Sequence, residues 1–450
     1  MKNTLLTGAA FVLLAGIVCA TDFESERATN WHHWRGPDAN GVAAMADPPV
    51  RWSEEENIKW KIEIPGKGSA TPIVWNDRIF VLTAIETDRK PDSNSANSAP
   101  EESSGRRRGG FGSVPSPQNY FSFVVLCYDR KTGEKLWEEV ATEAVPHESR
   151  HLTATFASGS PITDGNLIYA TFGSRGIYCY DMQGSFQWSR DLGDMRTRNE
   201  FGEGASPTLH EQTLVVPWDH EGQSFVTALD SQTGEPRWKV ERDEATTWAT
   251  PLVVDVDGVD QVVLHGTNRV RSYDLNDGRL IWECGGQAFN PVATPIAADG
   301  LVYCTTGRRG YAMSAIPLSA EGDITGTEEI AWNRTDSGAY VSSPVIYKGQ
   351  VYHVKECNAI LSCLDAKTGE ALFGPKRLPG LRNIYASIVA ASDRIYITDR
   401  EGKTLVLRHG PELEVLATNA LDEGADASLV LVGKEIFLRS EQHLYCITEN

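Results

Sequence analysis

The chain has 450 residues, 41% of them hydrophobic and 23% charged, which is an ordinary composition for a globular protein with a large core. Its formal net charge of −19 argues against nucleic acid and against an anionic membrane surface as partners, because both would repel it.

Residues 1–20 have the pattern of a secretory signal peptide. Lys2 precedes an apolar run that is too short to span a bilayer, and Val18-Cys19-Ala20 offers a small-residue cleavage site. We therefore expect cleavage after Ala20 and a periplasmic or secreted mature protein. A lipoprotein anchored through Cys19 is a weaker alternative, because Val18 stands where a smaller residue is usual. The rest of the sequence contains no transmembrane candidate.

Two segments of the mature chain lack a regular pattern. Residues 21–56 predict an irregular N-terminal extension, after which 57–64 alternate in polarity and predict a strand. Residues 87–120 have too few apolar side chains to order themselves, so we expect a disordered, mobile insertion there. Its arginine-glycine tract, Arg106 to Gly112, is typical of contacts with nucleic acid or anionic surfaces, but a solvated loop suits an acidic exported protein better.

A signal of small residues, usually followed by proline, recurs from Ser69 onward. Its copies are Ala70-Thr-Pro72, Gly159-Ser-Pro161, Ala205-Ser-Pro207, Ala249-Thr-Pro251, Ala293-Thr-Pro295, Ser342-Ser-Pro344, Ala386-Ser-Ile388 and Ala427-Ser-Leu429. The usual spacing is near 44 residues, and the first interval is about twice that because it contains the insertion. Four short strands per unit at this period are typical of a β-propeller.

The repeats predict an all-β fold over residues 57–450, an eight-bladed β-propeller of four-stranded antiparallel blades. The last repeat has room for only three strands, so we expect residues 57–64 to supply its outer strand and close the ring. Closure removes exposed sheet edges and predicts a monomer.

An Asp-x-x-Thr-Gly hairpin that leads to an aromatic residue recurs within these repeats, for example at 127–137 and 228–238. Gly provides the positive φ of the turn, and the Asp side chain caps it. We expect the aromatic residue to pack one blade against the next. The expected docking residues are Trp137, Trp188, Trp238, Trp282 and Phe373.

Seven cysteines remain after the expected cleavage. Four of them, Cys127, Cys179, Cys363 and Cys446, occupy a repeat position that holds Ala228 or Ser272 in other copies. That position favours a small buried side chain, so we expect packed thiols rather than disulfides.

Ligand-binding residues are expected where the loops that enter the innermost strands meet around the central channel. The candidates are His151, Arg198, Glu200, Trp248, Asn290, Tyr340, Arg382, Tyr385 and Asp426. Such a mixture suits a polar, planar or sugar-like ligand, or else these groups bond to one another and to water.

The sequence contains none of the common nucleophile, zinc-helix, phosphate-loop or haem-attachment motifs. Asp255, Asp257 and Asp260 surround a glycine and form a weak candidate for a calcium site, although other repeats have a plain turn at this position. A sugar-processing enzyme would need two carboxylates across the channel, for which Glu200 and Asp426 are the candidates.

The Ala/Cys-x-Asp-x-x-Thr-Gly-x-x-x-Trp element at 127–137 and 228–238, with Phe for Trp at 363–373, resembles the tryptophan-docking repeat of the pyrroloquinoline-quinone-like (quinoprotein-type) β-propellers. Trp34-Arg-Gly-Pro37 also resembles the opening of exported bacterial members whose function is largely uncharacterised. The resemblance extends over nearly the whole mature chain.

This resemblance implies either of two functional classes. Quinoprotein dehydrogenases oxidise alcohols or sugars with pyrroloquinoline quinone (PQQ) and Ca²⁺ at the channel mouth, whereas the outer-membrane β-barrel assembly factor is a scaffold without a cofactor. The alcohol dehydrogenases carry an adjacent Cys-Cys pair, which this chain lacks, and no catalytic residue is assigned. We favour an exported, non-catalytic binding or scaffold propeller with a protein, peptide or glycan on its loop face. The alternative is a PQQ- and calcium-dependent alcohol or sugar dehydrogenase.

Overall fold

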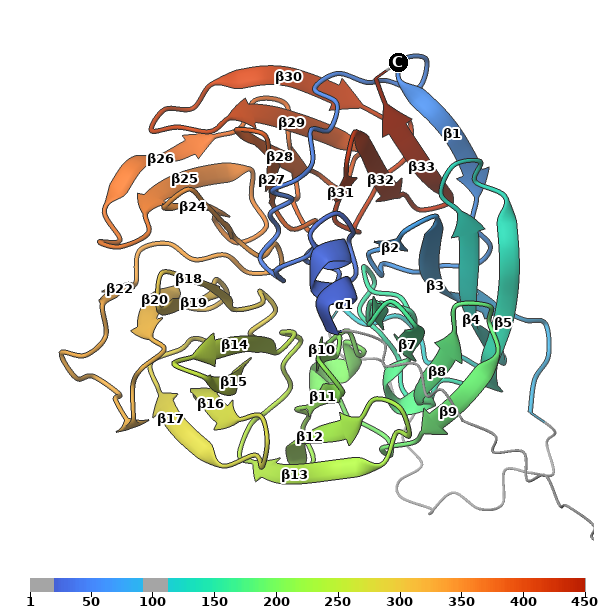
Figure 1. The fold of residues 1–450 in the computed structure, drawn as a ribbon, viewed down its shortest axis with the longest axis horizontal. Coiled ribbons are helices and arrows are strands. Elements are labelled where there is room, and N and C mark those ends of the chain that lie inside the picture. Colours follow the sequence, from blue (N-terminus) through green and yellow to red (C-terminus); the bar gives the residue numbers. More distant parts are fainter. Residues whose placement is uncertain (1–19, 92–111, 450) are drawn as a thin grey trace, which may run out of the picture.

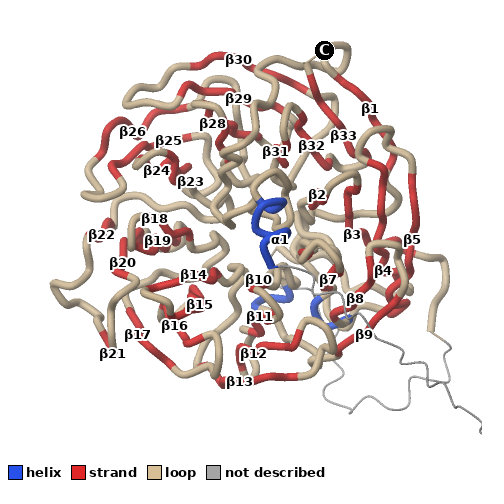
Figure 2. Tube along the Cα trace, in the orientation of Figure 1, coloured by secondary structure: helices blue, strands red, loops and turns tan. Residues whose placement is uncertain are grey.

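The computed structural model describes residues 20–91 and 112–449, and these form eight blades around a central axis (Figure 1). Figure 2 shows strands in the body of the ring and loops at its centre. The predicted eight-bladed β-propeller is confirmed. The expected signal peptide and the arginine-glycine tract lie almost entirely outside the described residues. None of the described helices is long and apolar enough to cross a membrane.

The blades follow one another along the chain. Blade 1 is β2 (Ile73–Trp75), β3 (Arg78–Glu86), β4 (Phe121–Asp129) and β5 (Lys135–Ala144); blade 2 is β6 (Ile162–Thr163), β7 (Leu167–Thr171), β8 (Ile177–Asp181) and β9 (Phe186–Arg190). Blade 3 is β10 (Thr208–His210), β11 (Thr213–Trp218), β12 (Ser224–Asp230) and β13 (Pro236–Arg242); blade 4 is β14 (Leu252–Val256), β15 (Val259–His265), β16 (Val270–Asp274) and β17 (Leu280–Cys284). Blade 5 is β18 (Ile296–Ala298), β19 (Leu301–Thr306), β20 (Ala312–Pro317) and β22 (Trp332–Arg334); blade 6 is β23 (Val345–Tyr347), β24 (Gln350–Val354), β25 (Ile360–Asp365) and β26 (Ala371–Arg377). Blade 7 is β27 (Val389–Ala391), β28 (Arg394–Thr398), β29 (Lys403–Arg408) and β30 (Val415–Ala420); blade 8 is β31 (Val430–Val432), β32 (Glu435–Arg439), β33 (His443–Thr448) and β1 (Ile58–Glu63).

The N-terminal strand closes the ring, as the sequence predicts. β1 pairs antiparallel with β33, for example Ile62 opposite Leu444, so the two ends of the propeller share one sheet. Blade 4 departs from the four-stranded pattern, because the short β21 (Gly322–Asp323) lies parallel to its outer strand.

Five tryptophans dock successive blades by the same contact. Each indole Nε1 donates a hydrogen bond of 2.8–3.1 Å to a carbonyl oxygen in a turn of the next blade, and the indole ring covers the glycine of that turn. They are Trp60, Trp137, Trp188, Trp238 and Trp332. Trp60 and Trp332 were not among the docking residues predicted from the sequence.

Trp282 and Phe373 occupy the same repeat position and behave differently. Trp282 is fully buried among side chains of blades 4 and 5, but its Nε1 donates to Gln261 of its own blade at 3.3 Å. Phe373 has no N–H to donate and packs in the hydrophobic cluster between blades 6 and 7.

The small-residue signals form a ring of hydrogen bonds around the channel. The middle residue of each is Ser or Thr, and in seven neighbouring pairs its hydroxyl accepts the backbone N–H of its counterpart at 2.9–3.1 Å. Thr250, in the remaining pair, accepts a hydrogen bond from the Trp34 indole at 3.1 Å. The signal therefore ties the inner strands of neighbouring blades together.

The N-terminal extension crosses one end of the channel. Its helix α1 (Ala20–Arg27), which the sequence analysis did not predict, lies at the centre of the ring in Figure 1. Trp31 then pairs with Val74 in blade 1. The buried Arg35 guanidinium donates to the carbonyl oxygens of Pro344 and Ile388, at the inner ends of blades 6 and 7.

The seven described cysteines are unpaired, and Cys127, Cys179, Cys363 and Cys446 are buried in the blades. Burial raises the pKa of the Cys127 thiol to about 12, which keeps it protonated at neutral pH. These cysteines therefore act as small core residues.

Candidate functional site

The end of the channel opposite the N-terminal extension is formed by two sets of loops. In an antiparallel blade, the loop that enters the first strand and the loop between the second and third strands lie at the same end. All the ligand-binding residues predicted from the sequence lie in the first set. We call this end of the propeller the loop face.

Three predicted residues, Arg198, Asn290 and Tyr340, lie together on the loop face. The Arg198 guanidinium is 3.4 Å from Asn290 Oδ1 and lies over the half-exposed Phe289 ring. Burial raises the pKa of Tyr340, and the Asn290 amide and Arg308 oppose this shift. The loops that enter blades 3, 5 and 6 thus contribute to one polar and aromatic group.

Loops between second and third strands add two arginines that the sequence analysis did not name. Arg308 lies over the Tyr340 ring, and Arg400 lies 4.4 Å from the centre of the Tyr385 ring. Arg400 also forms a bidentate ion pair with Asp426 at 2.5 and 3.0 Å. Antiparallel topology alone places both loops on this face, so their residues were within reach of sequence reasoning.

His151 lies within the electrostatic influence of both arginines. Burial lowers its pKa, and the positive charges of Arg308 and Arg400 lower it further. A neutral imidazole therefore accompanies guanidinium groups here. Within the described chain, Arg198 and Arg308 form no ion pair, so their charges are available to an anionic group.

The other predicted residues have different surroundings. The Trp248 indole donates to the Gly202 carbonyl at 2.8 Å, so its N–H already has a partner. The exposed Arg382 lies 3.8 Å from Glu401, and Glu200 lies near Glu148. The Asp255 carboxylate accepts the Gly258 N–H at 3.4 Å in a β-hairpin, while Asp260 faces His210 at 3.2 Å.

The C-terminal part of the predicted insertion is attached to the loop face. Ser113 pairs with His151, and the Val114 N–H donates to the Arg150 carbonyl at 2.9 Å. Ser113 and Val114 therefore contact the loop that enters blade 2, while 92–111, the larger part of the predicted insertion, lie outside the described residues. This contact was not predictable from the sequence because it joins two irregular segments.

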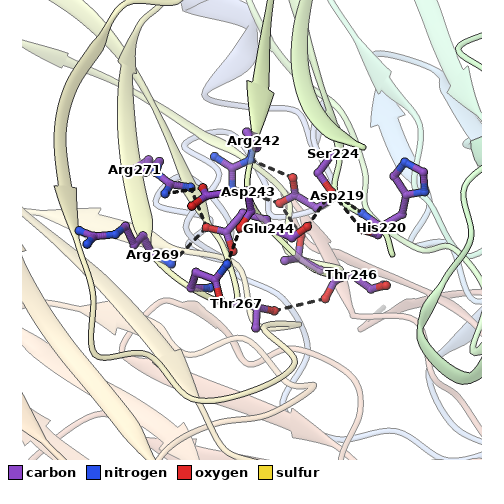
Figure 3. A network of polar contacts seen from close by, with 12 residues as sticks. Asp219, His220, Ser224, Arg242, Asp243, Glu244, Thr246, Thr267, Arg269 and Arg271 are labelled. Carbon is purple, nitrogen blue, oxygen red and sulfur yellow. Dashed lines mark hydrogen bonds and ion pairs between the residues drawn. The ribbon is translucent and has the colours of Figure 1, made fainter. Parts of the chain in front are cut away.

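A buried polar group between blades 3 and 4 is fully paired (Figure 3). Arg242 binds Asp219 through two hydrogen bonds, at 2.8 and 3.1 Å, and donates a third to the Tyr273 hydroxyl at 2.8 Å. Arg271 donates to Glu244 at 2.8 Å. We call these residues the blade 3–4 network. Each of its two buried carboxylates, Asp219 and Glu244, has a guanidinium partner, so the network fits a structural role.

A family model described as "Outer membrane protein assembly factor BamB" matches residues 122–374. Among curated proteins, ER membrane protein complex subunit 1 of Xenopus laevis is 26% identical over 193 residues. The match covers 42% of this chain but only 18% of that protein, so most of the relative has no counterpart here.

Solved structures share the fold at low sequence identity. BamB from Moraxella catarrhalis is 14% identical with a TM-score of 0.50, and the match covers 82% of this chain and 98% of that one. A quinohemoprotein alcohol dehydrogenase from Comamonas testosteroni is 10% identical with a TM-score of 0.63, covering 96% and 82% respectively. At these identities the likeness establishes the propeller architecture.

Proposed function

The chain belongs to the family of repeat propellers whose model is described as outer membrane protein assembly factor BamB, and from this we propose that it is an exported, non-catalytic binding or scaffold propeller. Its partner would bind the loop face around the channel. Residues 1–20 support export with cleavage after Ala20, which N-terminal sequencing of the mature protein tests.

The unpaired arginines on the loop face carry this proposal. Arg198 and Arg308 present positive charge in a chain whose net charge is −19, and each lies over an aromatic ring. Guanidinium groups beside exposed rings are typical of interface anchors. A protein or peptide segment that carries carboxylates and apolar side chains fits this surface best.

Photo-cross-linking in cells tests the location of the partner. A benzophenone amino acid in place of Phe289, which is 50% exposed on the loop face, is expected to give a discrete protein adduct. The same group in place of Leu280, which is 43% exposed on an outer strand, is the matched control. Adducts of equal yield at both positions, or at Leu280 alone, would contradict the proposal.

A PQQ- and calcium-dependent dehydrogenase is the second candidate, favoured by the TM-score of 0.63 to the quinohemoprotein alcohol dehydrogenase. Tyr340, Tyr385 and Trp248 supply planar rings on the loop face, and the arginines suit carboxylates of the quinone. Titration with PQQ in the presence and absence of Ca²⁺ separates the two functions. Saturable, calcium-dependent binding at one site would favour the dehydrogenase, whereas no binding is expected for the scaffold.

A further inference from the structure

Two loops place a histidine and two glutamates in one group on the loop face. His147 and Glu148 lie between β5 and β6, and Glu203 lies between β9 and β10. One potential ligand atom from each lies within 4.8 Å of the others, and His147 Nε2 is 3.7 Å from Glu203 Oε1. Among residues 20–91 and 112–449, this is the one group of three with metal-ligating geometry. We call it the His147 cluster.

Backbone and hydroxyl donors hold both carboxylates in place. Glu203 accepts the Ser174 N–H at 2.6 Å and also the Ser174 hydroxyl. Glu148 accepts the Thr197 N–H at 3.0 Å and also the Thr197 hydroxyl. Because these donors come from different loops, the fold fixes the two carboxylates independently of a ligand.

Gly173 makes room for the Glu203 carboxylate. It has a φ of +57°, and a Cβ added there would lie 1.6 Å from Glu203 Oε2. A side chain at this position would therefore strain the backbone and displace the carboxylate.

The His147 cluster contains two carboxylates and one imidazole, and no guanidinium or ammonium group. The neighbouring Arg175 is ion-paired with Asp194 and contacts His147 Nδ1 at 3.3 Å. One ligand atom of Glu148 and one of Glu203 lie within 4.8 Å of each other. A bound cation would balance these carboxylates.

The cluster also opens into a pocket between blades 1, 2 and 3. Apolar side chains on the pocket wall include Phe156, Met195 and Trp218, and the three cluster residues lie on the same wall. An ion held by three protein ligands beside a pocket keeps coordination positions free for water or a ligand.

We propose that His147, Glu148 and Glu203 bind a divalent first-row transition metal ion, with Zn²⁺ as the best match. Imidazole with two carboxylates suits Zn²⁺, whereas all-oxygen sets suit Ca²⁺ and Mg²⁺. Without metal, His147 Nε2 donates to the Met195 carbonyl at 2.6 Å. Metal binding at Nε2 replaces this hydrogen bond and moves the proton to Nδ1, which requires the Arg175 guanidinium, 3.3 Å from Nδ1, to turn toward its ion-pair partner Asp194.

Calorimetric titration of the chelator-treated mature protein with ZnCl₂ tests the site. We expect one ion per chain, and at least a tenfold loss of affinity in Glu203→Gln. Glu221→Gln is the matched control, because Glu221 lies on the same face and hydrogen-bonds to Thr246 outside the cluster. Parallel titrations use MnCl₂, CaCl₂ and MgCl₂.

Unchanged zinc affinity in Glu203→Gln would overturn the assignment, as would the absence of zinc binding to the wild-type protein. Tighter binding of Ca²⁺ or Mg²⁺ than of Zn²⁺ would overturn the choice of a transition metal. Circular dichroism and thermal melting establish that the variant is folded. If Glu203→Gln does not fold, Glu148→Gln makes the same test, because Glu148 supplies a ligand from the other loop.

Discussion

The blade 3–4 network and the His147 cluster are both polar groups partly or wholly buried on the same face of the propeller. In the network, each of the two buried carboxylates, Asp219 and Glu244, meets a guanidinium group, and the side chains of Arg242 and Asp219 are 0% and 1% exposed. In the cluster, two carboxylates meet one imidazole, and Glu203 retains 15% exposure toward a pocket. Each buried carboxylate of the network has a guanidinium partner, whereas the two carboxylates of the cluster share one imidazole.

This difference separates structural polar groups from binding sites. Burying a charge is unfavourable unless a partner compensates it, so each buried charge of the network needs an oppositely charged partner for the blades to pack. The cluster keeps its carboxylates fixed without such a partner. The comparison predicts opposite consequences for removing a charge in the two places.

The largest effect is expected in the network. Arg242→Met leaves the buried Asp219 carboxylate uncompensated, which should lower the free energy of unfolding by about 3–5 kcal/mol. Urea denaturation measures this loss. Arg279→Met is the control, because Arg279 is 62% exposed in its ion pair with Asp274 and should change stability by less than about 1 kcal/mol. An equal loss of unfolding free energy in the two variants would show that the buried ion pair contributes no more to stability than the exposed one.

Zinc should stabilise the protein through the cluster alone. At a free Zn²⁺ concentration 100 times Kd, binding adds about 2.7 kcal/mol to the free energy of unfolding. Thermal melting with and without chelator measures this gain in the wild type and in Glu221→Gln. The gain should vanish in Glu203→Gln, and its persistence there would place the stabilising ion elsewhere.

Two glycines with positive φ allow a smaller test of how the cluster is built. Gly193→Ala, where an added Cβ meets nothing within 4 Å, should lower stability by about 1 kcal/mol through backbone strain alone. Gly173→Ala adds a clash with Glu203, so we expect a loss of about 2 kcal/mol together with weaker zinc binding. Urea denaturation and zinc titration of both variants check this. Normal zinc affinity in Gly173→Ala would show that the space left by Gly173 is not needed to position the Glu203 carboxylate.

The smallest expected effect is the pH dependence of stability that His220, a residue next to the network, contributes. Burial lowers the pKa of His220 in the folded protein below its usual 6.5, so the unfolded chain binds a proton more readily. The contribution of the neutral His220 side chain to stability is fully present above pH 6.5 and is lost as the pH falls through the lowered pKa. The stability difference between wild type and His220→Gln, measured by urea denaturation at several pH values, should therefore shrink on acidification by less than about 1 kcal/mol. A stability difference that grows on acidification would show that folding raises the pKa of His220 instead of lowering it.

Most of the fold follows from local features of the sequence. The period of the small-residue signal predicts eight blades, and the missing last strand predicts closure by β1. Trp60 and Trp332 escaped notice because neither follows an Asp-x-x-Thr-Gly turn, yet both dock in the same way as Trp137. The path of the N-terminal extension was unpredictable, because its contacts join residues that are hundreds of positions apart.

The candidate sites were predicted less well than the fold. The loops that enter the first strands yielded Arg198, Asn290 and Tyr340, whereas Arg308 and Arg400 required attention to the second set of loops. The His147 cluster depends on how Ser174 and Thr197 orient carboxylates from separate loops. No spacing in the sequence encodes such contacts.

Anomalous X-ray diffraction from crystals of the mature protein soaked in ZnCl₂ tests the metal site most directly. The account predicts one strong zinc peak about 2.0–2.2 Å from His147 Nε2 and from an oxygen of each glutamate. Zinc peaks elsewhere in the crystal with none at the His147 cluster would contradict it, as would an undiminished peak in Glu203→Gln.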